Sequence, residues 1–215
     1  MTDFATQRKF MVDTQVRPSD VTDRRIIAAM LTVPREAFVP TARQSIAYMD
    51  EQLKVGGSRG LLAPRTLAKM VQNLDILAEH IVLDIGGATG YSAAVLARLA
   101  LRVVAVECDQ ALVAQARTAL AGIDTIKLVT GALPAGCPDE GPYDAILING
   151  AVAGVNASLL DQLKDRGRLV AIQLERGVGR ATIWRRFGTT FDQRVLFDAG
   201  APILPGFERK VEFFF

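Results

Sequence analysis

The sequence predicts an α/β fold with a doubly wound, mostly parallel sheet. From about residue 80 onward, short apolar runs alternate with helical segments, as in a parallel sheet covered on both faces. The C-terminal part loses that alternation and indicates antiparallel strands at one edge of the sheet. The first part is helical and mixed in polarity. We therefore expect an N-terminal helical extension and loop, residues 1–78, and a core, residues 79–215, in one compact domain.

The composition is that of an ordinary globular protein with one domain-sized core. The 215 residues are 50% hydrophobic and 22% charged. With 25 Lys and Arg against 23 Asp and Glu, the formal net charge of +2 gives no electrostatic argument for a nucleic-acid ligand. No run approaches the ~20 apolar residues of a membrane span, and the N-terminus lacks the apolar segment of a signal peptide. We expect a cytoplasmic protein without membrane or nucleic-acid partners.

The counts of cysteine and histidine exclude several kinds of site. Cys108 and Cys137 are too few for a disulfide framework, and nothing resembles a zinc spacing. The single histidine, His80, excludes a multi-histidine metal site, and a Ser-His-Asp triad would need His80 as its base. We expect a reducing compartment and no metal, and we interpret His80 as a residue of a connecting loop.

Prolines, glycines and caps divide the N-terminal extension. Polar residues after Pro18 offer caps for a helix over residues 21–31, and two prolines bracket a turn-rich connection at 34–40. Three glycines within residues 55–60 disfavour a regular element, so we expect a flexible loop there. Pro64 suits the first turn of a helix that runs to about Leu77.

In the core, apolar runs predict buried strands and periodic segments predict the helices between them. The core strands are expected at residues 81–85, 102–107, 126–130, 143–149 and 168–173, and the helices at 91–100, 111–120 and 156–164. Strands without intervening helix are expected in the tail at 181–186, 191–197 and 211–215.

The sharpest local feature is a glycine-rich turn between the first core strand and its helix. Gly86, Gly87 and Gly90 let the backbone approach a ligand closely, and the helix N-terminus supplies free N–H groups. Glu107 ends the next strand, 23 residues after Asp84, where a carboxylate can accept both hydroxyls of a ribose. Together these residues indicate a nucleoside-containing cofactor, with a tight turn that binds no ligand as the alternative.

The spacing of the glycines separates two classes of cofactor. A dinucleotide site requires G-x-G-x-x-G, and no start in this turn fits that spacing. Asp84-x-Gly86-x-x-x-Gly90 instead resembles the motif of class I S-adenosylmethionine methyltransferases, an acid followed by G-x-G-x-G. The antiparallel tail also resembles that Rossmann-like fold. Ala88 stands at the middle glycine, which the turn tolerates only if φ stays negative there.

Further segments resemble the protein-L-isoaspartate O-methyltransferase family. They are Asp23–Met30, Val33–Pro40, Ala47–Asp50, Ala63-Pro64, Val82–Gly86, Gly90-Tyr91, Gly141–Ile146 and Leu163–Val170. The resemblance implies transfer of a methyl group from S-adenosylmethionine to the carboxylate of an isoaspartyl residue in a damaged protein or peptide. An ionised carboxylate needs no general base, so such an enzyme mainly aligns the reacting atoms and excludes water.

The resemblance also implies a set of cofactor-binding residues. They are Asp84, Gly86, Gly87, Gly90, Glu107, Cys108, Gly131 and Ala132. The acid and the glycines would line the methionine end, Glu107 would hold the ribose, and the others would border the adenine. The family commonly has an acid where Ala132 stands, so we expect a weaker contact with the adenine amino group. We interpret Cys108 as a small apolar wall, because no base for a nucleophile is evident nearby.

The expected substrate loop departs from the family pattern. Members usually carry Thr-Ile-Ser or a similar run before the proline, whereas this chain places Leu62 at the serine position. Ser58 and Arg59 are candidates to compensate, and Arg59 could pair bidentately with a substrate carboxylate. A solvated loop charge is the alternative interpretation of Arg59. The change also leaves open a different carboxylate acceptor, or a cofactor-binding module without turnover.

Overall fold

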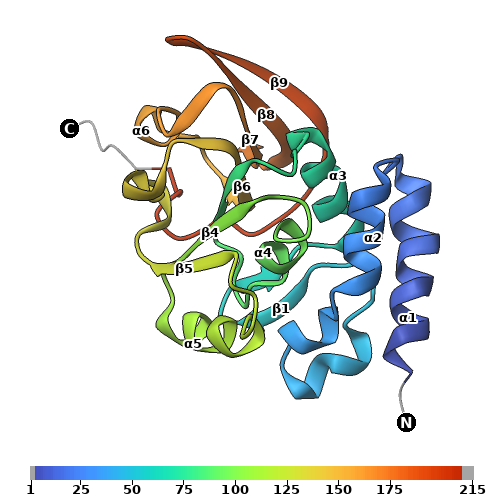
Figure 1. Ribbon diagram of the computed structural model, residues 1–215. Coiled ribbons are helices and arrows are strands. Elements are labelled where there is room, and N and C mark those ends of the chain that lie inside the picture. The colour runs from blue at the N-terminus through green and yellow to red at the C-terminus, as the bar shows by residue number, and fades with distance from the viewer. Residues whose placement is uncertain (1–2, 210–215) are drawn as a thin grey trace.

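A seven-stranded sheet forms the centre of the structure, a computed structural model in which residues 3–209 are described (Figure 1). The strand order is β5-β4-β3-β6-β7-β8-β9. Strands β3 to β7 run parallel to one another, whereas β8 and β9 are added antiparallel at one edge. This arrangement confirms the predicted doubly wound sheet with antiparallel C-terminal strands.

Each apolar run of the core forms a strand. The strands are β3 (Ile81–Ile85), β4 (Arg102–Glu107), β5 (Ile126–Thr130), β6 (Tyr143–Val152), β7 (Leu163–Glu175), β8 (Val178–Phe187) and β9 (Thr190–Asp198). The helices are α3 (Pro64–Leu74), α4 (Tyr91–Leu96), α5 (Gln110–Ala119) and α6 (Ala157–Leu160). Helix α6 is shorter than predicted because β7 begins already at Leu163, which pairs with Tyr143. The predicted strand at 211–215 lies outside the described residues.

Alternating side chains of the inner strands supply two apolar cores, one on each face of the sheet. Val82 of β3 and Val103 of β4 belong to one core, and their neighbours Leu83 and Val104 belong to the other. Both cores are closed by helices and loops, as the near-continuous apolar character of these strands requires.

The N-terminal extension packs against one of these two cores. It contains α1 (Phe4–Met11), a π-helical turn (Val12–Val16), α2 (Arg24–Thr32) and two 3₁₀ segments (Arg35–Phe38 and Thr41–Ile46). Helices α1 and α2 lie side by side at one flank of the molecule (Figure 1). Asp23 caps α2 by accepting a hydrogen bond from Arg25 N. The cap predicted just after Pro18 was wrong, because Asp20 there adopts a left-handed turn conformation with φ +61°.

Residues 53–61 form a β-hairpin where the sequence predicted a flexible loop. Strand β1 (Leu53–Gly56) pairs antiparallel with β2 (Arg59–Leu61). The prediction was wrong because the glycines assist this hairpin rather than oppose it. Gly57 has φ +51° in the turn, and a Cβ at Gly60 would lie 2.8 Å from the carbonyl oxygen of Leu53.

After β9 the chain returns along the carboxyl end of β6. Ala151 N donates to Pro202 O (2.9 Å), Leu204 N donates to Ala151 O (2.9 Å), and Ala153 N donates to Phe207 O (2.9 Å). We call residues 199–209 the C-terminal segment. Through these bonds it lies at the same edge of the sheet as the glycine turn. Within residues 3–209, no helix is long and apolar enough to cross a membrane.

Candidate functional site

The glycine turn and the end of β4 meet at the carboxyl edge of the sheet, as the sequence predicted. The parallel register places Ile85 beside Val106, and Gly86 N donates to Val106 O at 2.9 Å. Gly86 and Gly90 have φ values of +70° and +95°, which only glycine adopts without strain. Helix α4 begins directly after Gly90, so its N-terminus faces this edge.

The φ angle of Ala88 is not negative, although the sequence analysis required a negative value for an alanine at this position. Its value is +54°. This left-handed conformation costs an L-residue about 1–2 kcal/mol. Ala88 N donates a hydrogen bond to Glu107 Oε2 at 3.0 Å, which helps to hold the residue in this conformation.

Asp84 is fully buried behind the turn and bonded to its own chain. Its Oδ2 accepts a hydrogen bond from Ser92 Oγ (2.7 Å), and its Oδ1 accepts one from Asn149 Nδ2 (2.6 Å). Burial, with a smaller contribution from the nearby Glu107 charge, raises the pKa of Asp84 to about 6, although these two hydrogen bonds lower it. A Cβ at Gly87 would lie 2.6 Å from Asp84 Oδ2, so the carboxylate packs directly beneath the turn.

The sequence analysis missed both partners of Asp84. Ser92 lies in the first turn of α4, and Asn149 is the first polar side chain after the apolar run of β6. The sequence contained a signal for Asn149, because it is a polar residue that directly follows a buried apolar run. Asp84 thereby links β3 to α4 and β6 and fixes the turn between them, and its contact with a cofactor stays a prediction.

Arg59 forms a buried, bidentate ion pair with Glu107, the carboxylate expected to hold a ribose. Arg59 Nη1 lies 2.8 Å from Glu107 Oε1, and Arg59 Nη2 lies 2.9 Å from Glu107 Oε2. Arg59 Nη2 also donates to Gly86 O at 2.7 Å. Arg59 is 6% exposed and Glu107 is 2% exposed. Arg59 is therefore not a solvated loop charge, and its guanidinium is bonded to Glu107 and Gly86 within the chain.

Leu204 of the C-terminal segment covers the glycine turn. A Cβ at Gly86 would lie 2.9 Å from Leu204 Cδ1, and a Cβ at Gly150 would lie 2.5 Å from Leu204 Cγ. The cavity beside the turn has a volume of about 10 Å³, room for a single water molecule. It is lined by Gly60, Leu61, Leu62, Leu67, Gly87, Tyr91, Ser92 and Asn149. Leu204 was missed because its contact joins distant parts of the sequence.

The substrate-loop candidates occupy different environments. Ser58 is exposed at the tip of the β1–β2 hairpin, whereas Leu62 is buried and lines the small cavity beside the turn. Arg35, which the sequence analysis did not single out, is fully buried and holds the backbone of this region by hydrogen bonds. Its Nη2 donates to Leu62 O (2.9 Å) and its Nε donates to Ala47 O (2.8 Å). Its guanidinium lies 4.7 Å from the centre of the Tyr91 ring.

The residues expected beside an adenine lie where β4 and β5 end. Gly131 N donates to Glu107 O at 3.1 Å, Cys108 is half-buried and Ala132 is exposed. Burial and the Glu107 charge raise the pKa of the Cys108 thiol, which favours the neutral form and an apolar wall over a nucleophile. Among residues 3–209, no cluster of three His, Cys, Asp or Glu side chains is placed to hold a metal ion.

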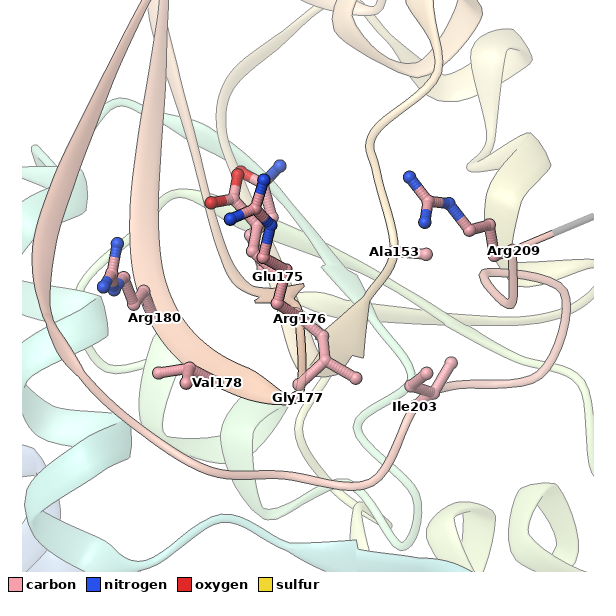
Figure 2. Close-up of a pocket in the computed structure, with 10 residues that line it drawn as sticks. Ala153, Glu175, Arg176, Gly177, Val178, Arg180, Ile203 and Arg209 are labelled. Carbon is pink, nitrogen blue, oxygen red and sulfur yellow. The ribbon is translucent and has the colours of Figure 1, made fainter.

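A larger cavity, of about 1000 Å³, opens where β7 turns into β8 (Figure 2). It is lined by Ala153, Gln173, Leu174, Glu175, Arg176, Gly177, Val178, Arg180, Ile203 and Arg209. Arg176 and Arg180 come from the β7–β8 hairpin and Arg209 from the C-terminal segment, and the three stand apart from one another in Figure 2. Ile203 faces this cavity, whereas the next residue, Leu204, packs against the glycine turn. The C-terminal segment therefore forms a wall between the two regions.

Comparisons with known proteins identify related sequences. The family described as Protein-L-isoaspartate(D-aspartate) O-methyltransferase (PCMT) matches residues 6–182. A protein-L-isoaspartate O-methyltransferase of Roseiflexus castenholzii is 38% identical over 170 residues, which cover 78% of each chain. One of Methanoculleus marisnigri is 41% identical over 167 residues, covering 77% of this chain and 76% of that protein.

Solved structures show the same fold. A protein-L-isoaspartate O-methyltransferase has a TM-score of 0.84 at 24% identity, covering 93% of this chain and 66% of that one. A second, from Plasmodium falciparum and in complex with S-adenosyl-L-homocysteine, has a TM-score of 0.81 at 18% identity, covering 92% and 97%. The family match extends over most of the chain, and the sequence relatives cover more than three quarters of it. The chain therefore belongs to the protein-L-isoaspartate(D-aspartate) O-methyltransferase family.

Proposed function

We propose that the chain is an S-adenosylmethionine-dependent carboxyl methyltransferase that acts on isoaspartyl residues of damaged proteins. The observation that carries the proposal is the family match over residues 6–182, the region that contains the glycine turn and Glu107. Protein repair follows from the family activity. Two unpaired cysteines, Cys108 and Cys137, support a reducing compartment such as the cytoplasm as its place of action.

The residues at the carboxyl edge fit S-adenosylmethionine in their chemistry. The carboxylate of Glu107 suits a pair of vicinal hydroxyls. Gly86 and Gly90 bring bare backbone to the ligand, and Cys108 with Gly131 would border the adenine ring. In the structure, Arg59 holds the carboxylate and Leu204 fills the adjoining space, so both side chains have to yield to the donor.

The chemistry asks little of the protein beyond positioning. S-adenosylmethionine supplies a methyl group bound to a positively charged sulfur. The acceptor carboxylate is ionised at neutral pH, so no side chain needs to remove a proton. Leu62, Leu67 and Tyr91 form the walls beside Gly87, and their apolar surfaces would exclude water from the reacting atoms.

The arginine-lined cavity supports an acceptor of acidic character. It opens at the same edge of the sheet as the glycine turn, beyond the C-terminal segment. Arg176, Arg180 and Arg209 outnumber the one carboxylate of the lining, Glu175, and the resulting positive potential would attract a peptide that carries a carboxylate. Arg180 is in part offset by Asp198, whose carboxylate lies 3.7 Å from its Nε.

Transfer of labelled methyl groups to a synthetic isoaspartyl peptide tests the proposed activity. The matched control is the same peptide with a normal aspartyl residue. We expect base-labile label on the isoaspartyl peptide alone, because a methyl ester hydrolyses in base and the normal carboxylate is displaced by one methylene. Absence of label from both peptides would contradict the proposed activity.

Two observations favour a second candidate, a family member with another carboxylate acceptor or without turnover. Leu62 cannot donate a hydrogen bond at the position where the family resemblance led us to expect serine, and the Arg59 guanidinium is paired with the Glu107 carboxylate. Methylation of free organic acids but not of peptides would indicate a different acceptor. Binding of S-adenosylmethionine without transfer to any carboxylate would indicate a silent binding module.

A further inference from the structure

We infer that Arg59 is an internal competitor of the methyl donor, whose guanidinium occupies the Glu107 carboxylate until the ribose hydroxyls replace it. The inference rests on the proposed function and states what sets donor affinity at that site. Arg59 would thus lower the affinity of the site for the methyl donor.

The hydrogen bonds of Glu107 show why the two ligands exclude each other. Oε1 accepts from Arg59 Nη1 (2.8 Å), Cys108 N (2.8 Å) and Asp109 N (3.2 Å). Oε2 accepts from Arg59 Nη2 (2.9 Å) and Ala88 N (3.0 Å). A carboxylate offers about four lone-pair sites, and five donors already converge on this one. Two ribose hydroxyls can bind Glu107 only when the guanidinium leaves.

The structure also shows why Glu107 tolerates that exchange. Without Arg59, the backbone N–H groups of Ala88, Cys108 and Asp109 still donate to its carboxylate. The buried charge therefore keeps three hydrogen bonds while the ribose arrives. Arg59 itself is the first residue of the short strand β2 and follows the exposed turn at Ser58, so its departure leaves the central sheet intact.

Leu204 opposes the donor by a different means, because it occupies space and not the carboxylate. Its side chain lies against Gly86 and Gly150, while the backbone of its segment is bonded to β6. Truncating Leu204 to alanine would open room over the glycine turn and leave the Arg59–Glu107 pair unchanged. The two side chains thus provide separate electrostatic and steric probes of one site.

Calorimetric titration of the full chain with S-adenosyl-L-homocysteine tests the inference without relying on activity. We would compare the wild-type protein with Arg59→Met, which keeps the apolar stem but removes the guanidinium, and with Leu204→Ala. Arg65→Met is the matched control, because Arg65 is an exposed arginine that pairs with Asp50. Because hydrogen bonds to charged groups are among the stronger ones in proteins, we expect Arg59→Met to bind roughly tenfold or more tightly. Leu204→Ala should also bind more tightly, and Arg65→Met should match the wild type.

The outcomes separate this inference from the proposed function. Equal affinities in the wild type and Arg59→Met, or weaker binding by Arg59→Met, would overturn the competition while the proposed function stands. Failure of all four proteins to bind would overturn both. If Arg59→Met does not fold, Arg59→Lys takes its place, because lysine keeps the charge but cannot form the bidentate pair. Ligand-induced increases in melting temperature give a second readout, which should be larger for either Arg59 variant than for the wild type.

Discussion

At the scale of single residues, Asp84 shows how a fully buried carboxyl makes stability depend on pH. Its folded-state pKa of about 6 lies above the 3.8 of the unfolded chain, because burial disfavours the charged form. As the pH rises between these values, the unfolded chain releases this proton first. The contribution of Asp84 to stability is therefore complete below about pH 4 and is lost as the pH rises through about 6.

We expect Asp84→Asn to remove this pH dependence. The two pKa values differ by an amount that corresponds to about 3 kcal/mol. The free energy of unfolding of Asp84→Asn, relative to wild type, should rise by up to that amount between pH 4 and pH 7. Urea unfolding of both proteins at several pH values measures this difference, in which the titration of all shared groups cancels. Parallel pH profiles for the two proteins would contradict the burial argument.

Ala88→Gly should stabilise the protein, although glycine usually does the opposite. The left-handed backbone at Ala88 costs alanine about 1–2 kcal/mol, which glycine would avoid. Glycine also loses more backbone entropy on folding, and this loss offsets part of the gain. We expect a net gain of about 1 kcal/mol in the free energy of unfolding. Ala94→Gly in helix α4 is the control, and it should lose about 1 kcal/mol. The prediction fails if both substitutions change stability in the same direction.

At the scale of elements, the β1–β2 hairpin delivers Arg59 to the site. Its strands pair closely because Gly60 has no side chain, and β2 then places the guanidinium against Glu107. A short two-stranded element such as this has little stability of its own. Its packing depends on Leu53, Val55 and Leu61, which lie buried in the adjoining core.

Gly60→Ala should disrupt this hairpin, because the new Cβ would lie 2.8 Å from Leu53 O, a backbone atom that cannot move aside alone. We expect a loss of about 1–3 kcal/mol in the free energy of unfolding, as for other overpacked sites. Gly154→Ala is the matched control, since its Cβ would meet no atom within 4 Å. Denaturant unfolding measures both. Equal stabilities for the two variants would show that the hairpin accommodates a side chain at Gly60.

Elements with a strong local pattern could be predicted from the sequence, and contacts between distant segments could not. The runs at 81–85 and 102–107 are long, apolar and bounded by turns, so β3 and β4 form where predicted. The glycine turn and Glu107 could be placed together for the same reason, since they lie at the ends of adjacent strands, and their role in cofactor binding stays a prediction. Nothing local indicated that Arg59 would turn toward Glu107, or that Leu204 would cover Gly86. Both contacts depend on how the hairpin and the C-terminal segment fold back over the sheet.

At the scale of the whole molecule, we propose that the N-terminal extension and the core form one cooperative unit over the described residues, 3–209. One of the two apolar cores contains residues of both parts. They are Met11 and Met30 of the N-terminal extension, Val82 of β3, Val170 of β7 and Ile183 of β8. Removing the extension would expose this side of the core to water. A division by sequence at residue 78 therefore does not correspond to two independently stable parts.

The single tryptophan offers a test of this unity. Trp184 is buried in β8, the strand next to the β9 edge of the sheet, and belongs to the other apolar core. We expect its fluorescence to report the same denaturant midpoint as the hydrogen-exchange protection of amides in α2. Loss of α2 protection at a clearly lower denaturant concentration would show that the extension unfolds by itself.

The ion pair between Arg59 and Glu107 has a kinetic consequence for a working methyltransferase. The donor and its demethylated product carry the same ribose, so both must displace the same guanidinium. The pair then weakens donor and product by one common factor and leaves the preference between them unchanged. Because weaker binding is expressed mainly in faster dissociation, the spent product would leave sooner. The ratio of product to donor that inhibits the enzyme would therefore stay the same, and turnover would become faster only where release of the product limits it.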